Sequence, residues 1–320
     1  MASLLDIRNL SVSFGGVPVV RGLDLRLEKG RTTCLVGESG SGKSMTAFSI
    51  MRLVPEPGCI EASALLFDGE DLLRLPEKAM RARRGRDISM IFQEPMTSLN
   101  PVLRIGRQIA EPLELHQGLT RKEALDKAVE LMALVGIPDA ANRLNDWPHQ
   151  FSGGMRQRVM IAMALACSPR LLLADEPTTA LDITIQGQIL RLLNRLARER
   201  DMAVLLITHD LGVVAEAADD VAVMYAGELV EQAPVRDFFE RPLHPYSQGL
   251  MACAPLLGNH AARRLPSIPG MVPLPSELPE GCAFAPRCPL AEAACRQKQA
   301  LREAAPGHMV RCWKARTPDA

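Results

Sequence analysis

Three short stretches of the sequence carry residue types that handle phosphate groups and water, and the first is GESGSGKS. Its glycines let the backbone curl so that successive N–H groups point at phosphate oxygens. A lysine can then reach the β- and γ-phosphates, and a serine hydroxyl can ligate Mg²⁺. The stretch predicts a nucleotide site, with contacts from Gly37, Glu38, Ser39, Gly40, Ser41, Gly42, Lys43 and Ser44.

The second stretch ends an apolar run, LLLA, with two adjacent acids, Asp175 and Glu176. Two carboxylates at the end of a buried strand are costly unless a cation or a proton transfer uses them, and a Mg²⁺–phosphate site does both. We expect Asp175 to hold Mg²⁺ and Glu176 to be catalytic, polarising the attacking water. The alternative is a surface turn with two solvated acids.

The third stretch is FSGGM, at the start of an expected helix. There Ser152, Gly153 and Gly154 would offer an anion free N–H groups and the positive end of a helix dipole. One nucleotide cannot easily use two phosphate cradles. We therefore expect this second cradle to face the nucleotide of another subunit.

Four cysteines, Cys282, Cys288, Cys295 and Cys312, crowd the end of the chain. In a reducing compartment such a cluster favours a metal site over disulfides. Their spacing, C-x5-C-x6-C-x16-C, matches neither the C-x2-C pairs of common zinc sites nor the bacterial ferredoxin run. The spacing alone indicates four soft ligands on irregular backbone.

These residues need elements to position them. The acidic run and the first loop each follow a strand, and strands alternate with helices, which predicts a parallel, buried α/β sheet. Near the N-terminus apolar and polar residues alternate with a period of two, which predicts antiparallel strands. We expect strands at 31–36, 87–93, 170–175 and 203–208 and helices at 183–200 and 212–218.

Two regions depart from this alternation. The stretch 96–166 is expected to be wholly helical, with Thr120 and Glu123 as a capping box and Gly136 ending that helix. Beyond about residue 236, frequent prolines exclude long helices and central strands and predict a largely irregular tail.

The composition narrows the class of protein. Among 320 residues, Lys+Arg 37 balance Asp+Glu 37, which excludes binding to nucleic acid by charge alone. No run has the pattern of a membrane span or a signal peptide, so we expect a cytoplasmic location.

Over residues 3–235 the chain resembles the ATP-binding subunit of an ABC transporter. The resemblance lies in the order of the three stretches, Gln93, the Ala180-Leu-Asp182 turn and His209. Further stretches extend the resemblance to nearly the whole chain. They are QEPMTSLNP, YAG, HPY and GCAFAPRCP, and they are similar to the D-type ATPases of oligopeptide and, above all, dipeptide permeases.

This resemblance implies a P-loop NTPase ABC cassette. Its RecA-like core with an antiparallel β subdomain would span residues 1–95 and 167–235, with a helical signature subdomain at 96–166. A Pro/Cys-rich extension would span 236–320. It also implies a [4Fe–4S] cluster on the four cysteines, with Zn²⁺ as runner-up.

The resemblance further assigns roles in an ATP sandwich of two subunits. Phe14 would stack on adenine, although it could be a plain core residue. Gln93 would sense Mg²⁺ and the lytic water, and His209 would contact the γ-phosphate as a second catalytic residue. The D-loop residue Asp182 would complete the nucleotide contacts.

The implied function is ATP-driven import of dipeptides or oligopeptides at the cytoplasmic face of the bacterial inner membrane. The implied partners are a second, related ATPase chain, two transmembrane permease subunits and a periplasmic peptide-binding protein, with no nucleic acid. Import of nickel, glutathione or another small solute is the alternative. A soluble ABC ATPase acting on DNA or ribosomes is a remote one.

Overall fold

The computed structural model describes residues 3–94, 98–178, 181–253 and 267–315. Contacts between residues divide the chain into two compact units. The first comprises Met1–Leu4, Leu27–Thr32 and Arg74–Ile207, and the second Leu5–Arg26, Thr33–Leu73 and Thr208–Ala320. The three-part division expected from the sequence follows functional subdomains and stays a prediction.

A parallel sheet forms the centre of the first unit. Strands β7 (Ile88–Ile91), β8 (Leu171–Asp175) and β9 (Ala203–Thr208) run side by side, with Ile88 opposite Leu171 and Leu171 opposite Ala203. Every residue of these strands is buried, as expected of strands covered on both faces. The three predicted strands are thus confirmed.

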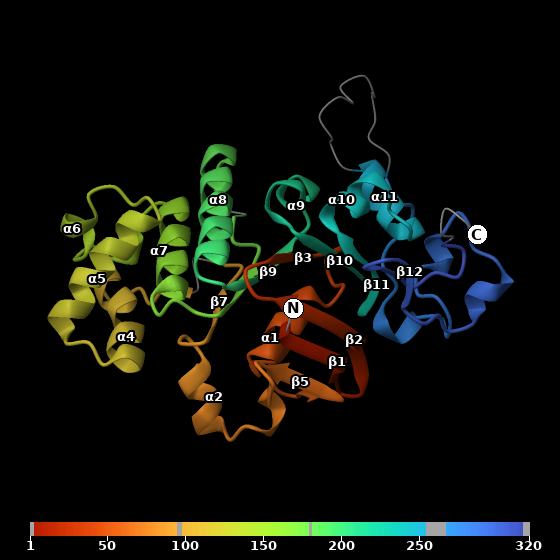
Figure 1. Cartoon of the computed structure of the whole chain (residues 1–320), viewed down its shortest axis with the longest axis horizontal. Coiled ribbons are helices and arrows are strands. Elements are labelled where there is room, and N and C mark those ends of the chain that lie inside the picture. Colours follow the sequence, from red (N-terminus) through yellow and green to blue (C-terminus); the bar gives the residue numbers. More distant parts are fainter. Residues whose placement is uncertain (1–2, 95–97, 179–180, 254–266, 316–320) are drawn as a thin grey trace. The chain divides into compact units, whose positions relative to one another are not determined.

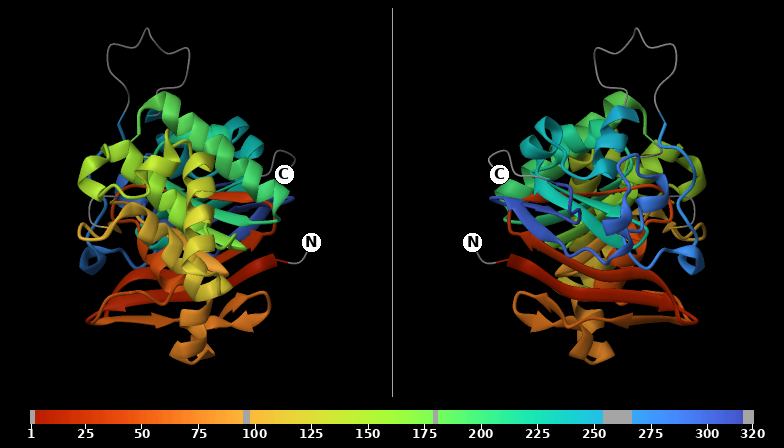
Figure 2. Two further views of the ribbon diagram at one scale, coloured as in Figure 1. Left: turned by 90° about the vertical axis from the view of Figure 1, so that its left-hand side faces the viewer. Right: turned by 90° about the vertical axis from the view of Figure 1, so that its right-hand side faces the viewer.

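Several helices also belong to the first unit (Figure 1). Helices α4 (Ile105–Gln117), α5 (Arg121–Leu134) and α7 (Gly153–Leu165) pack against one another (Figure 2, left). Thr120 and Glu123 form the predicted capping box at the start of α5. Shorter helices are α2 (Glu77–Arg83) and α6 (Ala140–Arg143), and α8 (Ile183–Glu199) is amphipathic.

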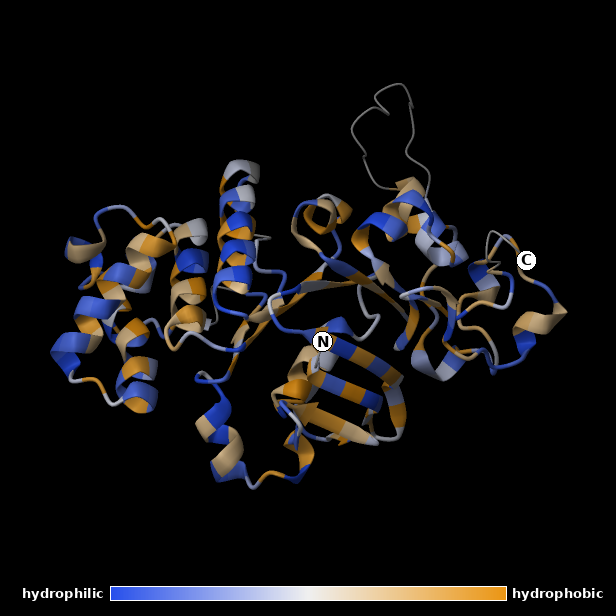
Figure 3. Cartoon of the chain, in the orientation of Figure 1, coloured by the Kyte–Doolittle hydropathy of each residue, from blue (hydrophilic) through white to orange (hydrophobic). Residues whose placement is uncertain are grey.

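The N-terminal part of the second unit is an antiparallel sheet. Strand β1 (Ser3–Phe14) pairs with β2 (Val17–Glu28), β4 (Gly58–Glu61) and β5 (Ala64–Phe67), and β5 pairs with β6 (Glu70–Asp71). Buried and more exposed residues alternate over residues 23–28 of β2, and Figure 3 shows apolar and polar residues of this sheet as orange and blue bands. This confirms the period-two prediction.

Another group of strands in this unit precedes and supports the first motif. Strand β3 (Thr32–Val36) pairs in parallel with β10 (Asp220–Tyr225), and β11 (Glu228–Pro234) pairs antiparallel with β10. Helix α1 (Lys43–Ile50) follows β3, and α9 (Leu211–Ala217), α10 (Val235–Glu240) and α11 (Pro245–Cys253) complete the unit's helices in the described residues.

The tail is less irregular than its prolines suggested. From residue 267 to 301 it holds only single 3-10 turns, as expected. Strands β12 (Arg302–Ala305) and β13 (His308–Val310) then form, and β13 pairs with β11 (Figure 2, right). The one proline here, Pro306, lies in the turn between them and therefore interrupts neither strand.

Within the described residues, no helix combines the length and the apolar character that crossing a membrane requires.

Candidate functional site

The phosphate loop lies between β3 and α1, in the predicted strand–loop–helix context. Gly37 and Gly42 have φ of 155° and 98°. A Cβ at Gly37 would collide with the backbone carbonyl of Met224, and one at Gly42 would lie 2.9 Å from the carbonyl of Val19. The close turn therefore requires glycine at both positions.

The side chain of Lys43, the first residue of α1, reaches back to the start of this loop. Its side-chain Nζ donates to the carbonyls of Gly37 at 2.8 Å and Glu38 at 2.9 Å, and the residue is buried. Ser41 is also buried, Ser44 is half-buried, and Ser39 and Gly40 are exposed. The cradle thus has a fixed cation and an open rim, as a phosphate site needs.

Two residues of the C-terminal extension support this loop. The hydroxyl of Tyr246, in α11, accepts a hydrogen bond from the Glu38 N–H at 2.9 Å. The guanidinium of Arg287 lies 2.9 Å from the Glu38 carboxylate. Tyr246 belongs to the HPY stretch and Arg287 to the GCAFAPRCP stretch, but the sequence alone did not indicate what either residue does.

The acidic pair ends β8 in the first unit. Asp175 is buried, at 2% exposure. Glu176 follows in the left-handed region, with φ of 49°, and its N–H donates to the carbonyl of Ile207 at 3.0 Å. A left-handed backbone costs a residue with a side chain about 1–2 kcal/mol, and such strain gathers at functional sites.

Gln93, just beyond β7, reaches the same carboxylate. Its Nε2 donates to Oε2 of Glu176 at 3.0 Å. The parallel pairing of β7 with β8 brings these two strand ends together. Two residues 83 positions apart, which the sequence placed at one reaction centre, are therefore in direct contact.

The signature stretch opens α7. Ser152 is the N-cap residue, and its Oγ accepts the Met155 N–H at 3.3 Å. Gly153 is exposed, and a Cβ there would meet no atom within 4 Å. Gly154 is half-buried in the first turn. The helix start is therefore open to an outside anion within the described residues.

Gln157 links this helix to the acidic loop, a contact that the sequence did not indicate. Its Nε2 donates to the carbonyl of Pro177 at 2.7 Å, and the side chain is buried. Because Pro177 directly follows Glu176, a shift of α7 would reach the acidic loop through this bond.

The other three residues predicted to belong to the nucleotide site differ in burial and in contacts. His209 is exposed between β9 and α9, in the second unit. Phe14 is half-buried at the end of β1, where a Cβ on Gly58 would touch its ring. Asp182 caps α8 by accepting the Ile185 N–H at 3.0 Å. The neighbouring Ala180 falls outside the described residues.

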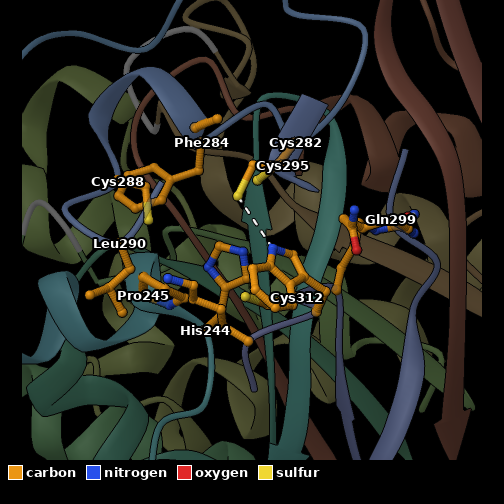
Figure 4. Close-up of a pocket in the computed structure, with 13 residues that line it drawn as sticks. His244, Pro245, Cys282, Phe284, Cys288, Leu290, Cys295, Gln299 and Cys312 are labelled. Atoms are coloured by element: carbon orange, nitrogen blue, oxygen red, sulfur yellow. Dashed lines mark hydrogen bonds between the residues drawn. The ribbon is translucent and has the colours of Figure 1, made fainter. Parts of the chain in front are cut away.

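The four late cysteines line a single pocket with His244 and Phe284 (Figure 4). They come from separate turns of the extension, and all are free thiols. Trp313 donates its Nε1–H to Sγ of Cys295 at 3.4 Å. Burial raises the pKa of the Cys282 and Cys288 thiols.

The predicted metal centre is not borne out by this arrangement. In the described part of the chain, no group of three or more His, Cys, Asp or Glu side chains is placed to hold a metal ion. The gathering of the four cysteines is confirmed, while the cluster itself stays a prediction.

A groove in the first unit runs beside α4. It includes the exposed side chains of Phe92 and Leu115, 39% and 72% accessible. Apolar residues left open on a concave surface indicate a binding surface. Other residues of the groove are Met90, Gln108, Glu111, His116, Met160 and Met163.

Comparison with known families agrees with this site. Residues 20–179 match the family described as "ABC transporter". Residues 230–295 match "Oligopeptide/dipeptide transporter, C-terminal region". The two matches together cover the phosphate loop, the signature, the acidic pair and three of the four late cysteines.

Individual relatives extend over nearly the whole chain. A "Probable peptide ABC transporter ATP-binding protein y4tR" of Sinorhizobium fredii is 52% identical over 98% of this chain and 95% of its own. An "Oligopeptide transport ATP-binding protein OppD" of Salmonella typhimurium is 50% identical over 97% of this chain and 93% of its own.

Solved structures share the fold. The dimeric "MJ0796, a Bacterial ABC Transporter Cassette" has a TM-score of 0.65 and 27% identity, covering 72% of this chain and 99% of its own. Its "post-hydrolysis state", bound to ADP and Pi, has the same TM-score at 26% identity over the same shares. This chain belongs to the ABC transporter family, as an ATP-binding ATPase subunit that carries the oligopeptide/dipeptide transporter C-terminal region.

Proposed function

We propose that this chain binds and hydrolyses ATP to energise an importer of dipeptides or oligopeptides. The contact of Gln93 with Glu176, at 3.0 Å on a strained backbone, carries the ATPase part of the proposal. The peptide cargo is supported by relatives at 50% and 52% identity that are named for peptide transport.

The phosphate loop fits ATP because its glycines leave a cradle that a Cβ would fill. In it, Lys43 would neutralise phosphate charge. Ser44 and Asp175 would supply oxygen ligands to Mg²⁺, and hydroxyl and carboxylate oxygens are what this ion prefers. Bound Mg²⁺ would offset the negative charge that develops on the phosphates.

Glu176 would then accept a hydrogen bond from the attacking water and polarise it. Gln93 would hold that carboxylate through its Nε2 and sense Mg²⁺. We assign to His209 the contact with the γ-phosphate, because its imidazole is exposed and follows a strand end. Phe14 would stack on adenine, and Asp182 would complete the nucleotide contacts.

The open N-terminus of α7 suits the nucleotide of a second ATPase subunit, related to this chain but different. We propose that the two subunits meet head to tail, with Ser152, Gly153 and Gly154 over the partner's phosphates. The groove around Phe92 and Leu115 would receive one of two transmembrane permease subunits. A periplasmic peptide-binding protein would deliver the cargo.

This assembly would place the chain on the cytoplasmic face of the bacterial inner membrane as a peripheral subunit. Partner chains would supply the membrane-spanning part of the importer.

We also propose a [4Fe–4S] cluster on Cys282, Cys288, Cys295 and Cys312. Four thiols on one pocket match the donor set of such a cluster, which would tie separate turns of the tail together. A single Zn²⁺ is the runner-up, because four thiolates are also a donor set for that ion. A colourless, iron-free protein prepared without oxygen would overturn the cluster.

The test replaces Glu176 by Gln. The variant should keep ATP binding but hydrolyse ATP about a hundredfold more slowly, because the water loses its polarising carboxylate. Glu199→Gln, an exposed carboxylate at the end of α8, is the matched control and should hydrolyse normally. Near-normal turnover by Glu176→Gln in the assembled importer would refute the role.

Cargo is tested by uptake of a labelled dipeptide in cells that lack this chain. Restoration by the wild type, but not by Glu176→Gln, would establish ATP-driven peptide import. If neither the wild type nor Glu176→Gln changed dipeptide uptake, the proposed ATPase activity would stand, but the cargo would be nickel, glutathione or another small solute.

A further inference from the structure

The second residue of the phosphate loop, Glu38, carries a negative charge in a loop that binds a polyanion. Its carboxylate is 29% exposed, whereas the Arg287 side chain opposite it is 6% exposed. The Arg287 Nη1 lies 2.9 Å from Oε2 and 3.2 Å from Oε1 of Glu38. One guanidinium nitrogen thus contacts both carboxylate oxygens.

Residues of the extension and of β10 fix Arg287. Its Nε donates to the carbonyl of Pro269 at 2.8 Å. The guanidinium also lies 5.8 Å from the ring centre of Tyr225, whose hydroxyl is 3.4 Å from Nη1. A buried arginine held on three sides approaches Glu38 already oriented, so little side-chain entropy is lost in the pair.

The backbone of Glu38 is held as well. Tyr246 accepts its N–H, and the Glu38 carbonyl accepts Lys43 Nζ at 2.9 Å. Glu38 is therefore attached to the extension through both its backbone and its side chain, while its carbonyl positions the lysine of the loop.

Charge decides what this contact does. An uncompensated carboxylate beside the phosphates would repel them, and the repulsion would be strong because the loop is partly shielded from water. The positive charge of Arg287 compensates the charge of the Glu38 carboxylate and so reduces its repulsion of the phosphates. This effect depends on the charges of the two side chains and not on how they pack.

We propose that Arg287 is a positioning residue for nucleotide binding: by neutralising Glu38 it lets the phosphate loop accept ATP, and it makes the C-terminal extension part of the nucleotide site. The inference rests on the proposed function, because it assumes that the loop binds the phosphates of ATP.

The experiment measures the Kd of a non-hydrolysable ATP analogue with Mg²⁺ on the full chain. Arg287→Met should weaken binding about tenfold, which corresponds to a loss of about 1.4 kcal/mol. Glu38→Gln should bind the analogue up to about threefold more tightly, because the loop loses a negative charge. The double variant should bind within about threefold of the wild type.

Two readouts separate this role from a structural one. In steady-state ATPase assays, Arg287→Met should raise KM for ATP while kcat at saturating ATP changes less than about twofold. Arg296→Met, an exposed arginine of the same extension, is the matched control and should leave the Kd unchanged. If Arg287→Met folds poorly, Arg287→Lys keeps the charge and should bind more tightly than the methionine variant.

Several results would overturn the inference. An unchanged Kd in Arg287→Met would do so. So would weaker binding in Glu38→Gln, or a double variant as weak as Arg287→Met, because a merely structural pair loses binding from either side. A wild type that fails to bind the analogue would instead overturn the proposed function, and this inference with it.

Discussion

Removal of the Glu231 carboxylate should loosen the C-terminal extension. Glu231, in β11, is fully buried at 0% exposure. It accepts the N–H of Leu243 at 2.7 Å and of His244 at 2.8 Å, and it hydrogen bonds His308 Nε2 at 2.7 Å. One carboxylate thus ties β11 to the chain entering α11 and to β13.

The magnitude follows from these three bonds. Hydrogen bonds to a charged group contribute about 1.5–3 kcal/mol each, and buried donors left without an acceptor lose that amount. Water that enters the space returns part of it, so Glu231→Ala should lower the unfolding free energy of the extension by about 4 kcal/mol. Glu231→Gln, which keeps one acceptor oxygen, should lose about half as much.

The assay is native-state hydrogen exchange, followed at the amides of α11 and β13, together with denaturant unfolding. Glu240→Ala is the matched control, because this exposed partner of Arg236 should contribute under about 0.5 kcal/mol. A Glu231→Ala protein whose extension exchanges as slowly as the wild type would refute the reasoning.

Three other substitutions test the site and the fold. Gly37→Ala should abolish ATP binding, because its Cβ would collide with a carbonyl of β10; an analogue Kd near that of the wild type would contradict this. Gln157→Leu should lower the ATPase rate more than ATP affinity, since it cuts the bond to Pro177, and equal losses in both would count against that link. The hydrogen bond from Arg8 lowers the pKa of the Asp6 carboxyl, so its stabilisation is present above about pH 4 and is lost as pH falls through the folded pKa. Asp6→Asn should therefore cost about 1 kcal/mol at pH 7 and little in strong acid, as denaturant unfolding at both pH values would show.

The sequence predicted those parts of the site whose signal is local. The phosphate loop, the acidic run and the capping box of Thr120 and Glu123 each depend on residues within about one helical turn or strand. In each of them, the residue types at a fixed spacing determine the local backbone conformation, so the spacing was enough to predict it. The strand-and-helix alternation likewise follows from hydrophobic patterns that are nearly independent of distant partners.

The contacts that the sequence could not predict join distant residues. Glu38 and Arg287 are 249 positions apart, and neither residue type is unusual by itself. Glu176 combines a left-handed backbone with a hydrogen bond to Ile207 on a neighbouring strand, and no local pattern encodes that combination. Strands β12 and β13 were missed because segments of four and three residues are too short to show a period.

The pairing of β13 with β11 has a practical consequence for shortened proteins. Strand β11 bonds to β10 on one side and to β13 on the other, so the tail protects its outer backbone groups from other chains. A protein ending before residue 302 would leave those N–H and C=O groups as an open template for strand addition, a common origin of aggregation. Isolated cassettes cut from this chain should therefore self-associate, even where every residue that touches ATP is kept.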